Sequence, residues 1–395
     1  MVCPDCSANI ADGARFCKYC GCNLKDHKES SAVAFCSECG ARLDSDSRHC
    51  AECGAAVVRE KNENGLDSFF ELDDMEKLID KQVSSKQRAS VADRVEIYEG
   101  RAYGLKEGCE EDAELFVPDG VEMIGDEDGN LVNCEKVVKI YIPKSVNYIP
   151  NNAFDFCSSL EEITVDEENP AFKSVGGVLF TKDESEIRCY PAKKQGESFT
   201  IPDRVQIIPG STFCECEFLE RLIIGKGVID IDPTAFYKTS FSSVIIAPDN
   251  PAYKVVDKTI VTKDGKTLVS WLIDIYCDRF ITPAGVTSIM HHACYCHESL
   301  ETLIIRDGVT DIGECAFFWC DRIKSVVLPE GLVSIDDSAF YSCKALKSIE
   351  IPDSVRNIND DAFCHTGIKS IALPKKCSAG RLFGYLNDYA TVTRK

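Results

Sequence analysis

The chain has 395 residues, of which 28% are charged, and its formal net charge is −21 at pH 7. It is long enough to bury a large core, and no stretch approaches the ~18 continuous apolar residues of a membrane-spanning helix. The acidity argues against a nucleic-acid partner, because a module that follows phosphates should be basic. The first residues have neither a basic start nor an apolar run, so we expect no secretory signal, and the 23 cysteines then fit a reducing cytoplasm.

Eight cysteines near the N-terminus form two units with the same spacing. Each unit has two Cys-x-x-Cys pairs separated by ten residues. The units are Cys3, Cys6, Cys17 and Cys20, and then Cys36, Cys39, Cys50 and Cys53. Four thiolates in two such pairs suit tetrahedral Zn²⁺, and a site closed by four thiolates is structural rather than catalytic. We therefore expect two structural zinc ions; the alternative is a disulfide framework, as in small secreted domains.

Both segments resemble the short bacterial zinc ribbons, and the first carries the Cys-Pro-x-Cys of that family. We assign zinc ribbon 1 to residues 1–28 and zinc ribbon 2 to residues 33–56. Each is too small for a core of its own, so metal binding should be part of its folding. Residues 57–90 form a charged linker, in which apolar residues close to helical spacing predict a helix near Leu66–Gln82. That helix either caps the first coils of the next domain or binds a partner.

A repeat of 23 residues dominates the rest of the chain. Its frame, V-x-x-I-x-x-x-A-F-x-x-C-x-x-L-x-x-I-x-I-P, is clearest in Val309–Pro329 and Leu332–Pro352. A fixed period of this size predicts a solenoid, in which each coil buries its apolar face against its neighbours. The L-x-x-I-x-I segment predicts a strand that the proline ends, and Ala-Phe predicts a short helical or 3₁₀ segment on the opposite side of the coil. Eleven strands are expected, ending at Val117, Ile142, Val165, Ile201, Ile224, Ile246, Thr282, Ile305, Leu328, Ile351 and Leu373.

Two coils are longer, with steps of 36 residues after Val165 and after Ile246. They share a second motif, which begins Asn-Pro-Ala at Asn169 and again at Asn250. Two apolar segments flank a turn in each, and Asp264–Gly265 is typical of a hairpin turn. We therefore expect each long coil to replace its helical turn with a protruding β-hairpin. The constant offset of 81 residues indicates that a larger unit was duplicated.

The recurring frame with its Ala-Phe-x-x-Cys resembles the leucine-rich repeats of bacterial BspA-like proteins of the treponemal type, over about Leu115 to Leu373. The resemblance implies an α/β fold, a right-handed, curved β-α superhelix that binds proteins or surfaces. Many proteins of this kind are exported adhesins. We place the solenoid, with a C-terminal cap, at residues 91–395.

The sequence does not suggest an enzyme. We find no Ser/His/Asp order, no phosphate loop and no paired carboxylates outside exposed strand positions. The segment Met290–His297 could be a metal cluster, but the repeat places Ala293–Cys294 in the Ala-Phe slot and His297 in the Cys slot, which favours core packing. We expect the other Cys-slot residues to be buried, free thiols, and the phenylalanines of the Ala-Phe pairs to stack in one buried column.

One column of residues is the candidate partner site. The residue between the last two apolar positions of each strand should point away from the core. Five consecutive members of this column are apolar and β-branched, and we call them the outward stripe: Ile223, Ile245, Ile281, Ile304 and Val327. A contiguous exposed apolar surface is typical of a partner site, whereas β-propensity alone would also favour these residues in strands.

The sequence therefore predicts a cytoplasmic, non-enzymatic scaffold for protein–protein interaction, which carries two structural zinc ions. One alternative is a zinc-ribbon protein with a nucleic-acid-binding or regulatory role. A cell-surface adhesin, exported without a recognisable signal, is the other.

Overall fold

The computed structural model describes residues 60–61, 67–68, 93–126, 128–239, 241–271, 277–383 and 390–395. The chain divides into two compact units, Met1–Ser85 and Lys86–Lys395. The eight ribbon cysteines lie outside the described residues. In the linker, β1 (Glu60–Lys61) pairs antiparallel with β2 (Asp67–Ser68). The predicted helix therefore does not include Asp67 and Ser68, and the rest of it lies outside the described residues.

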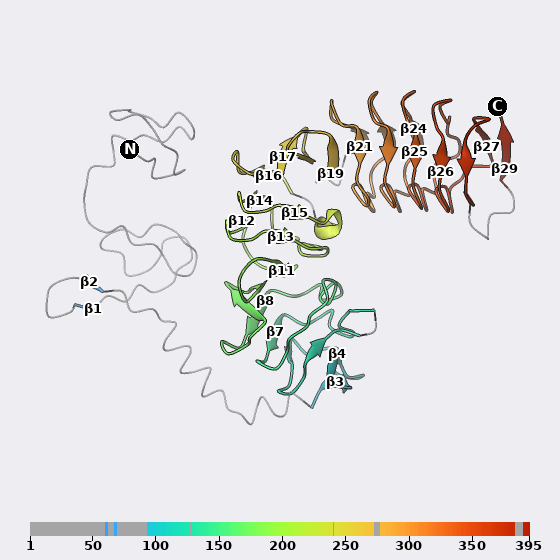
Figure 1. Ribbon diagram of the computed structural model, residues 1–395. Helices are drawn as coiled ribbons and strands as arrows, with labels where there is room; N and C mark the ends of the chain where they lie inside the picture. The colour runs from blue at the N-terminus through green and yellow to red at the C-terminus, as the bar shows by residue number, and fades with distance from the viewer. Residues whose placement is uncertain are drawn as a thin grey trace, which may run out of the picture. The chain divides into compact units, whose positions relative to one another are not determined.

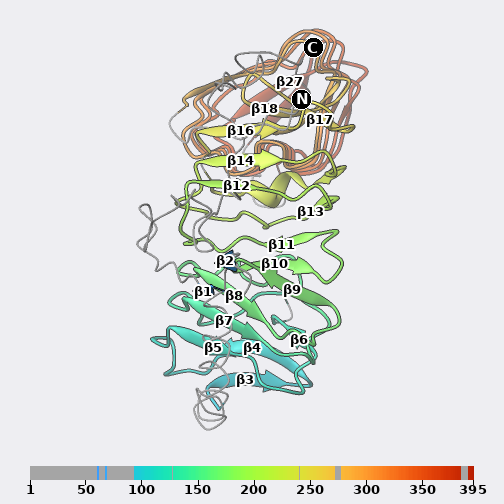
Figure 2. The same ribbon diagram turned by 90° about the vertical axis from the view of Figure 1, so that its left-hand side faces the viewer.

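The second unit is a β-solenoid of stacked coils (Figures 1 and 2). It opens with an antiparallel hairpin, and its repeat strands then form three parallel sheets and a terminal parallel pair. The hairpin is β3 (Val95–Tyr98) and β4 (Arg101–Leu105). The sheets are β5 (Glu114–Phe116), β7 (Lys139–Ile142) and β8 (Glu162–Val165); β12 (Ser198–Thr200), β14 (Arg221–Ile224) and β16 (Ser243–Ile246); and β20 (Arg279–Ile281), β22 (Thr302–Ile304) and β24 (Ser325–Val327). The terminal pair is β27 (Ser370–Leu373) and β29 (Thr391–Arg394).

Ten of the eleven predicted strands are present, each ending at or one residue before the predicted position. The exception precedes Ile351, which is buried without belonging to a strand. The predicted alternation also holds: Leu303 and Ile305 are buried, whereas Ile304 between them is only half-buried. The repeat thus fixed which side chains face the core of each coil.

Further parallel ladders, which we did not predict, follow the V-x-x-I positions in three separate sheets. Their strands have two residues each, too few for a periodic pattern to be visible in the sequence. They are β6 (Met123–Ile124), β13 (Ile207–Ile208), β15 (Asp230–Ile231), β21 (Ser288–Ile289), β23 (Asp311–Ile312), β25 (Ser334–Ile335), β26 (Asn357–Ile358) and β28 (Ser378–Ala379).

The solenoid differs from the expected α/β superhelix because its Ala-Phe turns are not helical. Within the described residues the one helix is the 3₁₀ helix η1 (Pro233–Phe236). In the coils of Phe213, Cys294, Phe317, Phe340 and Phe363, left-handed residues interrupt the turn, whereas the turn of Phe154 has none. Around Ala316–Phe317, for example, Cys315 has φ 53° and Trp319 has φ 58°. A residue with positive φ cannot continue a right-handed helix, so the turn stays open.

These open turns bond to the next coil as well as within themselves. The Phe317 N–H donates to the Ala339 carbonyl at 2.8 Å, and the N–H one coil further, of Phe340, donates to the Ala362 carbonyl at 2.9 Å. The helix η1 lies in the last short coil before the second long coil, which has no Ala-Phe turn to accept such bonds. Its N–H groups bond within the turn instead.

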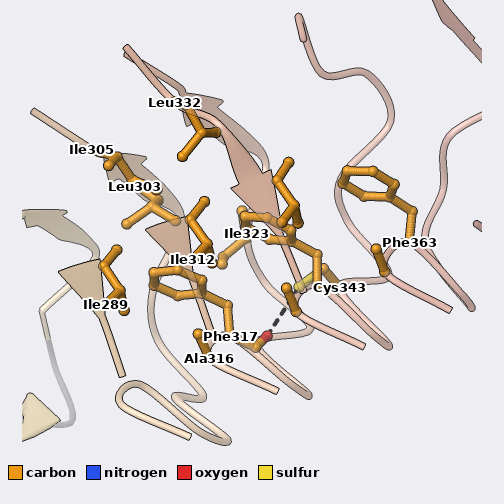
Figure 3. Packing of buried hydrophobic residues seen from close by; sticks show 14 of the residues in the cluster. Ile289, Leu303, Ile305, Ile312, Ala316, Phe317, Ile323, Leu332, Cys343 and Phe363 are labelled. Carbon is orange, nitrogen blue, oxygen red and sulfur yellow. Dashed lines mark hydrogen bonds between the residues drawn. The ribbon is translucent and has the colours of Figure 1, made fainter. Parts of the chain in front are cut away.

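The phenylalanines of the Ala-Phe slot are all buried, as predicted: Phe154, Phe213, Phe236, Phe317, Phe340 and Phe363. Five of the rings, all but that of Phe154, stack in two runs rather than in one column. The Phe317 and Phe340 centroids are 5.3 Å apart, and those of Phe340 and Phe363 are 5.7 Å apart (Figure 3). Phe213 and Phe236 form the other run. The runs are separate because Cys294 occupies the slot between them.

The Cys-slot thiols are free and act as hydrogen-bond donors. Cys343 Sγ donates to the Phe317 carbonyl at 3.3 Å (Figure 3), and Cys320 Sγ donates to the Cys294 carbonyl at 3.1 Å. Thr239 Oγ1 donates in the same way from the same slot, which explains why a hydroxyl replaces the thiol there. Burial raises the pKa of the Cys320 thiol to about 12, so it stays protonated at neutral pH.

Each long coil forms three antiparallel strands that contain the predicted hairpin. The strands are β9 (Phe172–Val175), β10 (Val178–Thr181) and β11 (Ile187–Cys189), and β17 (Tyr253–Val256), β18 (Thr259–Thr262) and β19 (Thr267–Trp271). In the first long coil they are a sheet of their own, and in the second they continue through β19 into one of the two-residue ladders as a single eight-stranded sheet. These hairpins do not protrude. Leu179 packs into the core cluster before the sheet, and its neighbours Val178 and Phe180 pack into the cluster after it. The long coils therefore divide the core into three clusters.

Candidate interaction surface

The structure places the outward stripe outside the core. Ile245 is 46% exposed and Val327 is 50% exposed, and the other three residues are half-buried. Ile223 pairs with Ile245 in one sheet. Ile281, Ile304 and Val327 are successive partners in the next sheet. The second long coil separates these sheets, so the stripe consists of a group of two and a group of three rather than one unbroken line.

The group of three is a compact apolar patch with a charged rim. Neighbouring parallel strands lie about 4.8 Å apart, so the three β-branched side chains contact one another. Beside them, Lys324 forms an ion pair with Glu301 at 2.7 Å. An apolar centre with a polar edge is the usual composition of a protein interface. An exposed ion pair of this kind contributes little to stability, about 0–1 kcal/mol, but it can orient a partner.

The same column carries an aromatic pair that the sequence reasoning did not count as a site. Phe116 on β5 stacks on Tyr141 on β7, with ring centroids 4.1 Å apart and planes 2° apart. The sequence does show two aromatic residues in the same slot of consecutive coils. This pattern could have predicted the stacked pair, because the parallel register brings such residues face to face.

The histidine-rich segment packs as the repeat predicts. Ala293 and Cys294 are buried, and the His297 ring stacks on the Trp271 ring with centroids 4.1 Å apart. His291 and His292 lie at the turn, where burial and the neighbouring His291 lower the pKa of His292. No group of His, Cys, Asp or Glu among the described residues is arranged to hold a metal ion.

These features define a solenoid of the leucine-rich-repeat class with an exposed sheet face. The family model described as "BspA type Leucine rich repeat region (6 copies)" matches residues 107–184, 188–253 and 276–382, and the chain belongs to this family. A second model, the double zinc ribbon, matches residues 3–54 and so covers all eight ribbon cysteines. The resemblance found in the sequence is thereby confirmed for both parts.

Several solved structures are similar to the chain. A leucine-rich repeat protein from Eubacterium ventriosum is 25% identical over 68% of each chain, with a TM-score of 0.41. A leucine-rich cell surface protein from Faecalibacterium prausnitzii is 20% identical over 75% of this chain and 90% of its own, with a TM-score of 0.45. The pneumococcal vaccine antigen PcpA is 18% identical over 76% of this chain and 85% of its own, with a TM-score of 0.41. The curated proteins searched gave no match. Among the described residues, no helix has the length and apolar character needed to cross a membrane.

Proposed function

We propose that the protein is a non-enzymatic scaffold that binds a protein partner through the outward stripe. The observation that carries the proposal is the patch of Ile281, Ile304 and Val327. Val327 is exposed and the other two are half-buried, although the residues on either side of them in each strand face the core. Apolar side chains in a contiguous exposed patch lower the free energy of binding when a partner removes them from water.

The test is a pair of substitutions in the full-length chain, Ile245→Glu with Ile304→Glu. Both side chains point away from the core, so we expect the melting temperature to change little and partner capture to be lost. A matched control is Thr164→Glu with Ala372→Glu, which places two carboxylates in the same column but outside the stripe. Equal capture by the two variants would contradict the stripe as the site, and a large fall in melting temperature for Ile245→Glu would make that residue part of the core.

We further propose that the ribbons hold two structural zinc ions, one in each four-cysteine set. The donor chemistry fits this metal, since thiolates in two Cys-x-x-Cys pairs are the usual ligands of a closed tetrahedral site. Zinc would fold each ribbon and supply no chemistry beyond that. Metal analysis of the purified chain should give two zinc ions per molecule, and Cys36→Ser with Cys39→Ser should leave one. Disulfides among the eight cysteines would contradict the proposal.

A reducing compartment fits the thiols of the solenoid, and we propose that the protein works in the cytoplasm. All 14 cysteines that the structure describes are free, including the pair of neighbouring Cys-slot residues Cys320 and Cys343. In an oxidising compartment, cysteines that lie close together usually form disulfides. Fractionation of cells that produce the full-length chain would test this, and recovery of the protein from the cell surface would contradict it.

A further inference from the structure

A second surface lies on the turn side of the coils, away from the outward stripe. The residue after the Ala-Phe slot is aromatic in four coils, and we call these residues the turn-side ladder: Tyr237, Tyr295, Phe318 and Tyr341. Their centroids are 5.6, 5.3 and 4.7 Å apart in that order, and the last two contacts are stacked with planes 10° and 5° apart. Tyr295, Phe318 and Tyr341 therefore stack face to face along the solenoid, and Tyr237 meets Tyr295 at 61°; all four rings are half-buried.

From the coil of Phe236 onward, the next residue of each turn forms a parallel column beside the ladder. Its members are Lys238, Cys296, Trp319, Ser342 and His365, all with left-handed backbone at φ between 52° and 58°. Their common conformation makes equivalent side chains leave the coil in the same direction. Ser342 is the small member between Trp319 and His365, and its size opens a groove of about 630 Å³. Phe318 and Tyr341 of the ladder, together with Lys344 and Thr366, complete the lining.

Trp319 presents an aromatic face to this groove. Its side chain is 53% exposed, and its ring lies within 23° of the plane of Phe318. Because the ladder rings stack along the solenoid axis, a ring nearly parallel to them turns its face toward the next coil, where Ser342 leaves space. His365 does not close that space, since its ring lies edge-on against Tyr341 with centroids 5.1 Å apart and planes 81° apart.

The charge of the groove is opposite to that of the whole chain. The net charge of the chain is −21, yet the lining contains one cation, Lys344, and no carboxylate. Lys344 is exposed and forms no ion pair with any residue that the structure describes. A ligand that fits this lining has a flat or apolar face for the indole and a negative charge for the ammonium.

The backbone of the groove is already occupied, which argues against a peptide bound by strand addition. The Trp319 N–H donates to the Tyr341 carbonyl at 2.8 Å, and the Ser342 N–H donates to the Cys364 carbonyl at 2.8 Å. An extended peptide that binds by strand addition needs free main-chain groups of this kind. The groove offers instead an aromatic face, hydroxyl groups and one ammonium, all from side chains.

We propose that this groove binds a carboxylate-bearing oligosaccharide. One sugar ring lies on the Trp319 indole, with its C–H groups against the aromatic face. Its carboxylate accepts a hydrogen bond from Lys344 Nζ. Thr366 Oγ1 already donates to the Phe363 carbonyl at 2.8 Å, so it accepts from one sugar hydroxyl, and Ser342 Oγ bonds to another. The volume is within the range of small-ligand sites, about 300–1,000 Å³, and the open form of the groove suits a stretch of a longer chain. This site is separate from the outward stripe and does not depend on the proposed protein partner.

Tryptophan fluorescence of the full-length chain tests the proposal. The chain has two tryptophans, and Trp271 is buried in the core, so a ligand that contacts Trp319 should change the emission of that residue. The probe is trigalacturonic acid, and galactotriose is its neutral counterpart. We expect saturable binding of the acidic probe. By calorimetry, Trp319→Ala should lower the affinity for it at least about tenfold. Lys344→Gln should bring the affinity for the acidic probe down to that for the neutral one.

Two further variants separate binding from folding. Ser342→His should fill the groove and abolish binding. His365 already has the same backbone conformation in that column, but Ser342 is buried, so the melting temperature of the variant is measured to separate loss of binding from loss of folding. Phe156→Ala removes an aromatic ring that is 55% exposed in the equivalent slot of another coil, and it should leave binding unchanged. The proposal is overturned if the acidic sugar does not bind at millimolar concentration, if Trp319→Ala binds it as well as the natural chain does, or if a tetra-glutamate peptide binds as tightly.

Discussion

Replacement of Asn250 by alanine should destabilise the solenoid strongly, because this side chain makes four hydrogen bonds at a fully buried position. Its Nδ2 donates to the Gly225 carbonyl at 2.9 Å and to the Val228 carbonyl at 2.8 Å. Its Oδ1 accepts from the Ala252 N–H at 2.9 Å and from the Tyr253 N–H at 2.8 Å. One amide thus ties the start of the second long coil to the coil before it.

The expected loss follows from these four bonds. A hydrogen bond contributes about 0.5–1.5 kcal/mol net, and a buried group left without a partner costs about 1–3 kcal/mol. Water that enters the space left by the amide can satisfy some of the four groups. We therefore expect Asn250→Ala to lower the free energy of unfolding by about 3–4 kcal/mol. Asn169 makes the equivalent four contacts in the first long coil, and Asn169→Ala should cost a similar amount.

Urea unfolding of the full-length chain, followed by circular dichroism, measures the change. Asn147→Ala removes an exposed asparagine and serves as the matched control, with no expected loss. Asn250→Asp keeps the shape but replaces the two donors with an acceptor that faces two carbonyls, so it should be at least as destabilising as alanine. If Asp is tolerated at this position, or if Asn250→Ala behaves like the control, the hydrogen-bond account of the long coil is wrong.

Three other predictions concern the core. Phe340→Ala should lower the free energy of unfolding by about 3–5 kcal/mol, because a fully buried ring between two others leaves a cavity; a loss below that of a surface substitution would refute the burial. Burial raises the pKa of Asp155 to about 6, although Ser211 donates a hydrogen bond to its carboxylate. Between about pH 4 and pH 6 the folded state therefore holds a proton that the unfolded state has lost. The free energy of unfolding should fall as the pH rises from about 4 to about 6. Asp155→Asn should remove that fall, about 1–2 kcal/mol for a partly buried group, and an unchanged pH profile in urea titrations would exclude the carboxylate as its source. Cys343→Ser should be nearly neutral in the same assay and Cys343→Ala should cost about 1 kcal/mol, since the hydroxyl can still donate to Phe317; equal values would show that the slot is only packing.

The sequence by itself determined the period, the direction of the side chains and the position of the irregular coils. A 23-residue repeat lets the same residue recur at the same point of every coil, so Leu303 and Ile305 could be assigned to the core and Ile304 to the surface. The hairpins of the long coils could likewise be located, because Asp264–Gly265 and its flanking apolar segments form a local turn. These features depend on contacts within one coil or between identical slots of neighbouring coils. Both kinds of contact can be predicted from the repeated sequence alone.

Only the tertiary structure decided what each coil bonds to. The two-residue ladder strands, such as Asp311–Ile312, have no local pattern, and they exist because the neighbouring coil supplies their partners. The Ala-Phe turns look helical by composition but become open turns, since left-handed residues such as Trp319 direct their N–H groups to the next coil. The same inter-coil stacking gathers Trp319, Ser342 and Lys344 around one groove. The repeat in the sequence predicts which side chains of a coil face the core. The hydrogen bonds and surfaces between coils arise only when the coils are stacked.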